Sequence, residues 1–152
     1  MNEKAGRRLR VLFVCTGNSA RSQMAEAILR ARAGDDFEVF SAGVDPRGIN
    51  PLTIRVLGDA GISTEGLRSK SVNEMLDRQF DYVITVCDRA RESCPVFPGS
   101  HESFHWGLDD PAEATGSEAE RLAVFRRVMG EIVTRIDTFA LAARHAEAGA
   151  HR

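Results

Sequence analysis

Short apolar runs alternate along this chain with stretches whose apolar residues recur three or four positions apart. Runs rich in β-branched and aromatic residues predict four strands, at about residues 9–14, 37–42, 82–86 and 102–106. The helical repeat predicts helices at about residues 22–33 and 51–60, short helical segments at 71–76 and 89–93, and a long last helix from Ser117. Because strands and helices alternate, we expect an α/β fold, a four-stranded parallel sheet with helices on both faces.

The pattern fits one domain over residues 1–152, without an internal repeat or a linker. The last helix carries a clear apolar stripe, made by Leu122, Phe125, Met129, Ile132, Ile136 and Phe139. We expect an ordered core over about residues 9–144, a loose polar segment before it, and a tail that frays from His145 onward.

The composition of the chain argues against some classes of binding partner. The chain is 43% hydrophobic and 28% charged, with a net charge of −2, so no bulk basic field attracts nucleic acid or an anionic membrane. No apolar run is long enough to span a bilayer or to act as a signal peptide. We therefore expect a cytoplasmic protein that binds neither nucleic acid nor membrane. We also expect a monomer, although the sequence leaves weak dimers open.

The most informative stretch runs from Val11 to Ser22. A buried strand leads into a loop of small and polar residues, and the loop leads into a helix. Loop N–H groups and the helix dipole favour negative charge, and Arg21 adds a planar, permanently charged fork. The same field would favour the thiolate of Cys15. The stretch therefore predicts a nucleophile beside a site for a tetrahedral oxyanion.

Three cysteines are present, Cys15, Cys87 and Cys94. An odd number without a C-x-x-C pair argues against a disulfide framework and favours catalytic thiols, and the four histidines are not spaced for a zinc site. We expect no bound metal or cofactor. Cys15, Cys87 and Asp110 each follow a predicted parallel strand, so they should meet at one edge of the sheet.

The segment Cys15-Thr-Gly-Asn-Ser-Ala-Arg21-Ser22 is a C-x₅-R-S signature. With it the chain resembles the low-molecular-weight tyrosine phosphatase superfamily, and within that superfamily the thioredoxin-coupled arsenate reductases. Cys87 and Cys94 have the spacing of that family's redox pair, His105 to Pro111 resembles its acid loop, and Ser41-Ala-Gly43 resembles the end of its second strand.

The resemblance implies a role for each matching residue. Cys15 attacks arsenate, Ser22 stabilises the thiolate, Asn18 shapes the loop, and Asp110 is the general acid, with Asp109 structural. The oxyanion-binding loop comprises Cys15, Thr16, Gly17, Asn18, Ser19, Ala20 and Arg21. His105 and Trp106 are interpreted as packing residues.

The resemblance also implies a relay of thiols. Cys87 attacks Cys15 and releases arsenite, Cys94 then takes over the disulfide, and thioredoxin reduces it. In a helix, residues 87 and 94 would lie roughly 10.5 Å apart, whereas a disulfide needs Cα atoms within about 7 Å. We therefore expect the segment to unwind on oxidation.

One position departs from the family pattern. Some members bind a monovalent cation beside the loop through an asparagine, a glutamate, a serine and an aspartate. Asn18, Glu26 and Ser41 match the first three, but Lys70 stands at the aspartate position. We expect the Lys70 ammonium to replace the cation.

Two other functions fit parts of the pattern. A phosphotyrosine or small-phosphoester phosphatase would use Cys15, Arg21 and Asp110 and ignore the other cysteines; phosphate and sulfate would in any case compete with arsenate. The tyrosine pair that usually follows the acid loop of such phosphatases is absent, since residues 112–116 read Ala-Glu-Ala-Thr-Gly. A non-enzymatic redox sensor or anion-binding module is the third alternative.

Overall fold

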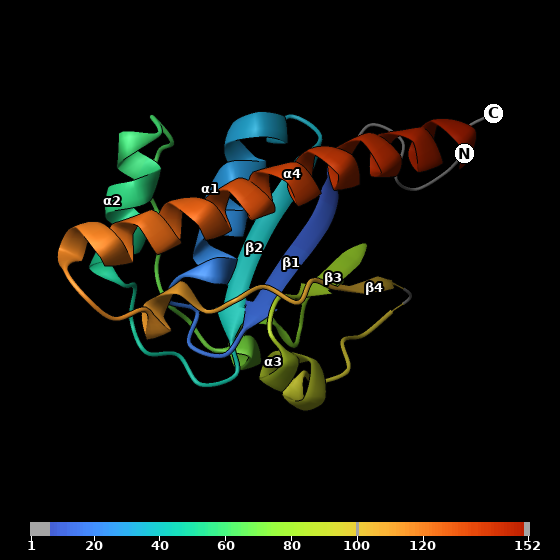
Figure 1. Ribbon diagram of the computed structural model, residues 1–152. Coiled ribbons are helices and arrows are strands. Elements are labelled where there is room, and N and C mark those ends of the chain that lie inside the picture. The colour runs from blue at the N-terminus through green and yellow to red at the C-terminus, as the bar shows by residue number, and fades with distance from the viewer. Residues whose placement is uncertain (1–6, 100, 151–152) are drawn as a thin grey trace.

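The computed structural model describes residues 7–99 and 101–150. Its sheet has four parallel strands in the order β2-β1-β3-β4 (Figure 1). The strands are β1 (Leu9–Cys15), β2 (Phe37–Gly43), β3 (Tyr82–Thr85) and β4 (Glu102–His105). The predicted fold class and all four strands are confirmed.

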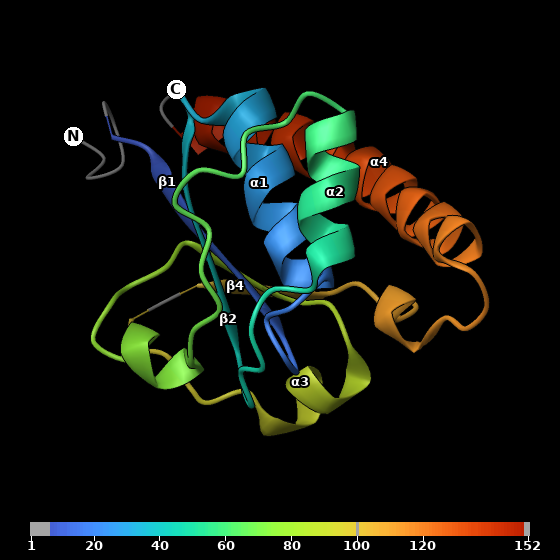
Figure 2. The ribbon, with the colours of Figure 1, turned by 90° about the vertical axis from the view of Figure 1, so that its left-hand side faces the viewer.

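Four helices and two 3-10 turns connect and cover the strands. They are α1 (Arg21–Ala33), α2 (Pro51–Asp59), η1 (Val72–Met75), α3 (Asp88–Ser93), η2 (Pro111–Glu113) and α4 (Glu118–Ala150). Helices α1, α2 and α4 gather on one side of the sheet, while η1 and α3 lie on the other side and at the carboxyl ends of the strands (Figure 2).

The central strands are buried on both faces, which explains their continuous apolar runs. Phe13 of β1 and Ile84 of β3 are fully buried, and Ile132 and Ile136 of α4 pack into the same core. The Arg32 guanidinium of α1 donates two hydrogen bonds to Asp137 of α4, at 2.6 and 2.8 Å. The predicted stripe of the last helix is thus its core face, with Met129 only partly buried.

The sequence signals for helix starts are confirmed. The Asn50 side chain accepts a hydrogen bond from the N–H of Leu52, directly before Pro51. Ser117 and Glu120 exchange two bonds, one from each backbone N–H to the other side chain.

The prediction of a fraying tail is wrong for residues 145–150, because α4 continues to Ala150. Alanine-rich sequence is the best helix former, and Ala140 and Ala143 are buried against the core. Arg144 also donates a 2.7 Å hydrogen bond to Asp36. Residues 1–6, which belong to the segment predicted to be loose, and residues 151–152 lie outside the described part of the chain. Arg7, at the start of that part, forms an ion pair with Asp81.

The strand order reverses between β1 and β3, since the chain moves outward to β2 and then returns to the other side of β1. Loops at such a reversal diverge and leave a crevice beyond the carboxyl ends of the strands. Cys15 is the last residue of β1, and Cys87 follows β3 by two residues. The fold therefore brings the first two cysteines to one crevice.

Candidate functional site: an oxyanion loop with a second thiol

The loop between β1 and α1 has an unusual backbone that its neighbours enforce. Asn18 has a φ of 47°, in the left-handed region that asparagine tolerates better than most residues. The end of β2 approaches the loop so closely that a Cβ on Gly43 would lie 2.6 Å from the Thr16 carbonyl oxygen. Glycine is therefore required at position 43 for this loop shape.

The Asn18 side chain is fully buried and uses its whole amide. Its Oδ1 accepts from the Lys70 backbone N–H at 2.9 Å and from Gln23 Nε2 at 3.0 Å. Its Nδ2 donates to Ser22 Oγ at 2.8 Å and to Ser41 Oγ at 3.0 Å. Asn18 thus ties the loop to α1, to β2 and to the segment before η1.

The Cys15 sulfur lies among hydrogen-bond donors. Ser22 Oγ is 2.8 Å away, and the Asn18 backbone N–H donates to the sulfur at 3.2 Å. Because Ser22 Oγ already accepts from the Asn18 amide, its own hydrogen is free to point at the sulfur. Two donors directed at one sulfur can stabilise negative charge on it during the reaction.

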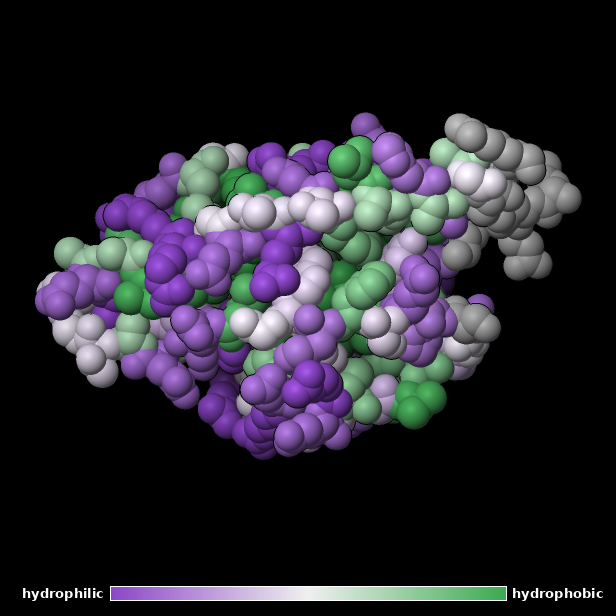
Figure 3. Space-filling model, turned by 45° about the vertical axis from the view of Figure 1, so that its right-hand side comes forward, coloured by the Kyte–Doolittle hydropathy of each residue, from purple (hydrophilic) through white to green (hydrophobic). Residues whose placement is uncertain are grey.

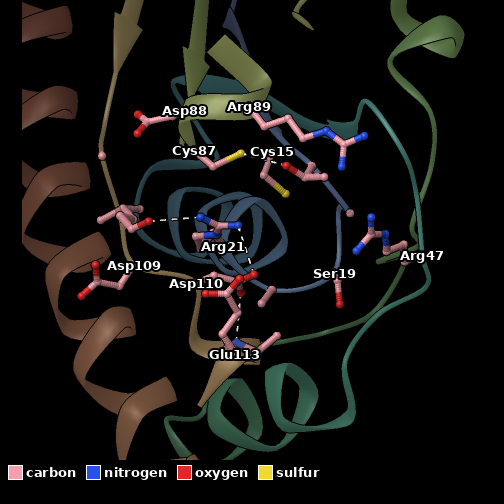
Figure 4. Close-up of a pocket in the computed structure, with 16 residues that line it drawn as sticks. Cys15, Ser19, Arg21, Arg47, Cys87, Asp88, Arg89, Asp109, Asp110 and Glu113 are labelled. Carbon is pink, nitrogen blue, oxygen red and sulfur yellow. Dashed lines mark hydrogen bonds and ion pairs between the residues drawn. The ribbon is translucent and has the colours of Figure 1, made fainter. Parts of the chain in front are cut away.

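The loop offers further donors to an anion. In the part of the chain that the structure describes, the backbone N–H groups of Ser19, Ala20 and Arg21 have no protein acceptor. The Arg21 side chain is mostly buried; its Nη1 donates to the Leu108 carbonyl at 3.1 Å, and its Nη2 lies 3.5 Å from Asp110 (Figure 4). These groups form a preorganised receptor for a tetrahedral oxyanion.

Asp110 and its neighbour Asp109 behave differently. Asp110 caps η2 by accepting from the Ala112 N–H at 3.0 Å, and its other oxygen faces Arg21. Asp109 turns outward to Arg127 on α4, 3.4 Å away. Only Asp110 is therefore oriented toward the oxyanion loop by a contact within the site.

The second thiol lies at the rim of the same crevice. Cys87 is buried, and its sulfur is 3.2 Å from the Thr16 hydroxyl of the oxyanion loop. Cys87 and Cys94 flank α3, the first directly before it and the second directly after it. All three cysteines are free, and partial burial raises the pKa of the Cys94 thiol.

Behind the loop, Glu26 forms a buried ionic cluster. Its carboxylate accepts from Ser41 Oγ and from Arg30, both at 2.6 Å, and the Lys70 ammonium is 3.6 Å away. Lys70 also donates to the Arg68 carbonyl at 2.8 Å, and burial lowers the pKa of this lysine. An ammonium cannot ligate a cation, so this arrangement does not fit a potassium site.

The site opens into a cavity of about 610 Å³ lined by loop, α3 and acid-loop residues (Figure 4). Among the predicted site residues, its wall includes Cys15, Thr16, Gly17, Ser19, Ala20, Arg21, Cys87 and Asp110. Asn18, Ser22, Glu26 and Ser41 are buried behind it. Cys94 does not line it.

Sequence reasoning missed several residues at the site. Gln23 is fully buried and donates to Asn18 and to the Arg68 carbonyl. Arg47 and Arg89 line the cavity and add positive charge. His105, interpreted as packing, is hydrogen-bonded to Thr85 and to Asp88 at the start of α3. His105 lies at the carboxyl end of a predicted strand, and this position indicates a possible role at the site. No sequence pattern indicates such a role for Gln23.

The described residues contain neither of two further kinds of feature, a metal-binding cluster and a membrane-spanning helix. Within residues 7–99 and 101–150, no group of three or more His, Cys, Asp and Glu side chains is arranged to hold a metal ion. None of the helices in these ranges has the length and apolar character needed to cross a membrane.

Comparisons with known proteins agree with this geometry. The sequence profile described as low molecular weight phosphotyrosine protein phosphatase matches residues 10–148. An arsenate reductase of Halalkalibacterium halodurans is 43% identical over 140 residues, which cover 92% of this chain and 97% of that one.

Solved structures agree as well. A thioredoxin-dependent arsenate reductase of Corynebacterium glutamicum superposes with a TM-score of 0.74 at 30% identity, covering 93% of this chain and 65% of that one. An arsenate reductase in a phosphate-binding state gives a TM-score of 0.69 at 28% identity, with 86% and 95% covered.

Proposed function

This chain belongs to the low molecular weight phosphotyrosine protein phosphatase family, and we propose that it reduces arsenate to arsenite through a relay of Cys15, Cys87 and Cys94 that thioredoxin regenerates. The observation that carries the proposal is the 3.2 Å contact between Thr16 Oγ1 and the Cys87 sulfur, which brings a second thiol to the wall of the oxyanion cavity. Hydrolysis of a phosphoester would use Cys15, Arg21 and Asp110 and would not require this second thiol.

The first step is a displacement at arsenic. The Cys15 thiolate attacks arsenate bound by loop N–H groups and Arg21, and an arsenate oxygen leaves as water. Asp110 supplies the proton for that oxygen as general acid. The product is a covalent Cys15–arsenic adduct, still in the arsenic(V) state.

The second step is the reduction. The Cys87 thiolate attacks the Cys15 sulfur, a disulfide forms, and the electron pair of the sulfur–arsenic bond stays on arsenic. Two thiols are thereby oxidised, and arsenic(V) becomes arsenic(III), released as arsenite. The Cys94 thiolate then attacks Cys87, frees Cys15 and leaves a Cys87–Cys94 disulfide for the dithiol of thioredoxin.

The relatives and the cavity support a small inorganic substrate. The protein of Halalkalibacterium halodurans, 43% identical, is an arsenate reductase, and the structural neighbour from Corynebacterium glutamicum is thioredoxin-dependent. The cavity wall, among the described residues, contains no aromatic side chain. An aryl phosphoester would therefore find charged and small groups, instead of an apolar ring surface.

The test is arsenate-dependent NADPH consumption with thioredoxin and thioredoxin reductase, run beside the same assay with glutaredoxin and glutathione. We expect sustained turnover with thioredoxin and little with glutaredoxin. No arsenate-dependent consumption, or equal rates with both reductants, would contradict the proposal.

A phosphoester phosphatase is the second candidate, because Cys15, Arg21 and Asp110 form the set that such an enzyme needs. Cys87→Ser separates the two functions. It should abolish multiple-turnover arsenate reduction and spare any hydrolysis of p-nitrophenyl phosphate. Full reductase turnover in this variant would refute the relay.

A further inference from the structure

We propose that His105 is a positioning residue that fastens the first turn of α3 through Asp88 and so controls how readily the Cys87–Cys94 disulfide forms. The proposal rests on the relay described above. It assigns a role to three side chains outside the oxyanion loop, Thr85, His105 and Asp88, which join β3, β4 and α3.

The imidazole is fixed on both sides. Thr85 and His105 are paired across the β3–β4 ladder, and Thr85 Oγ1 is 2.8 Å from His105 Nδ1. On the far side of the ring, His105 Nε2 is 3.0 Å from Asp88 Oδ1. The backbone is anchored at the same point, since the Trp106 N–H donates to the Thr85 carbonyl at 2.8 Å. His105 is therefore a rigid support.

The direction of these bonds follows from the donor inventory. An ionised carboxylate only accepts, so the hydrogen of the outer bond is on His105 Nε2. A threonine hydroxyl can donate to a neutral Nδ1 or accept from a protonated one. The bond to Asp88 is thus compatible with either charge state of the ring.

Apart from the buried Ala90 and its contacts with β1 and β3, helix α3 has few interactions that hold it in place. It is six residues long, too short to be stable by itself. Only Ala90 of the helix is buried, and the surface over this part of the molecule is mostly hydrophilic (Figure 3). Within the described residues, the bond to His105 is the side-chain hydrogen bond that links α3 to another element.

The hydrogen bond between His105 and Asp88 lies where it can affect formation of the Cys87–Cys94 disulfide. Asp88 directly follows Cys87, and α3 spans the whole interval to Cys94. Because helical residues seven apart lie about 10.5 Å from each other, α3 must unwind before the two sulfurs can join. Unwinding from its first residue moves Asp88 away from His105. The bond therefore stabilises the reduced form and opposes the disulfide.

The effect is measured on the full chain carrying Cys15→Ser, which leaves only the Cys87–Cys94 pair. The protein is equilibrated in mixtures of reduced and oxidised dithiothreitol, free thiols are alkylated, and the disulfide fraction is read by mass spectrometry. We expect Asp88→Ala to favour the disulfide about fivefold, as loss of one partly exposed hydrogen bond implies. His105→Phe should shift the equilibrium in the same direction.

Three comparisons separate the bond from other effects. Asp88→Asn removes the charge and keeps an acceptor oxygen, so it should remain near the starting value. Glu92→Ala removes an exposed carboxylate of the same helix that has no partner in the described part of the chain, and should also change little. The double variant Asp88→Ala/His105→Phe should equal Asp88→Ala, which also removes the 3.8 Å contact of Asp88 with Arg91, because the bond to His105 is already lost in that single variant.

Equal disulfide equilibria in the starting protein and in Asp88→Ala, or additive effects in the double variant, would overturn the role of His105. Absence of a Cys87–Cys94 disulfide in every variant would contradict the relay. The two failures are distinct, because the titration requires no arsenate and no reaction at position 15.

Discussion

The hydroxyl of Thr16 lies 3.2 Å from the sulfur of Cys87. Thr16 directly follows Cys15, the last residue of β1, so this one contact joins the oxyanion loop to the segment that follows β3. The parallel pairing of β1 and β3 makes the contact possible, because both segments leave the sheet at the same edge. Two thiols therefore share one cavity without any large movement of the fold.

Ser22→Ala should slow the alkylation of Cys15 by iodoacetamide at neutral pH by about tenfold. The substitution removes one of two donors to the sulfur, and a hydrogen bond to a charged group contributes about 1.5–3 kcal/mol. Ser103→Ala, on the exposed strand β4, is the control and should leave the rate unchanged. An unchanged rate in Ser22→Ala would show that its hydroxyl does not stabilise the thiolate.

Asp110→Asn should lower the rate of the first chemical step by about 10²–10⁴-fold, the usual contribution of a general acid. Asp109→Asn is a matched control, because that carboxylate faces Arg127 and not Arg21. Its rate should stay within about threefold of the starting enzyme. A loss of this size makes the first step rate-limiting for arsenite release in a single turnover, so that release measures both variants, and similar losses in the two variants would refute the separate roles.

Lys70→Met should destabilise the protein by about 2 kcal/mol, measured by urea unfolding. It leaves the buried Glu26 carboxylate without one of its partners, although Arg30 and Ser41 remain. Arg68→Ala, which removes an exposed partner of Glu74, should cost much less.

The same lysine predicts the response to cations. The melting temperature and activity of the unmodified chain should be the same in potassium and sodium chloride. Lys70→Asp would complete a set of oxygen ligands and should gain a preference for potassium. A potassium response of the unmodified chain would count against the proposal that Lys70 replaces a cation.

Cys94 should be alkylated with an apparent pKa above the usual thiol value of about 8.5, because burial raises the pKa of this group. The measurement uses Cys15→Ser/Cys87→Ser, folded and in urea. The folded state keeps a proton that the unfolded state releases, so this group lowers stability as pH rises through that range. Identical alkylation profiles with and without urea would contradict the effect of burial.

Local patterns predicted most of the fold and the oxyanion loop. The β-branched runs located the strands, and the C-x₅-R-S segment located Cys15 and Arg21, because adjacent residues fix both features. The alanine-rich end of the chain is compatible with a helix, but local sequence does not reveal that Ala143 is buried, and α4 therefore extends beyond the predicted start of fraying. Gln23 and the His105–Asp88 bond arise only when distant elements pack together. A cytoplasmic location and a monomeric state stay predictions.

The most direct test of the relay is a single turnover of Cys94→Ser with excess arsenate and no reductant. We expect one arsenite released per protein chain, together with a Cys15–Cys87 disulfide detected by mass spectrometry of the non-reduced peptides. Arsenite release without that disulfide, or continued turnover beyond one equivalent, would contradict the relay.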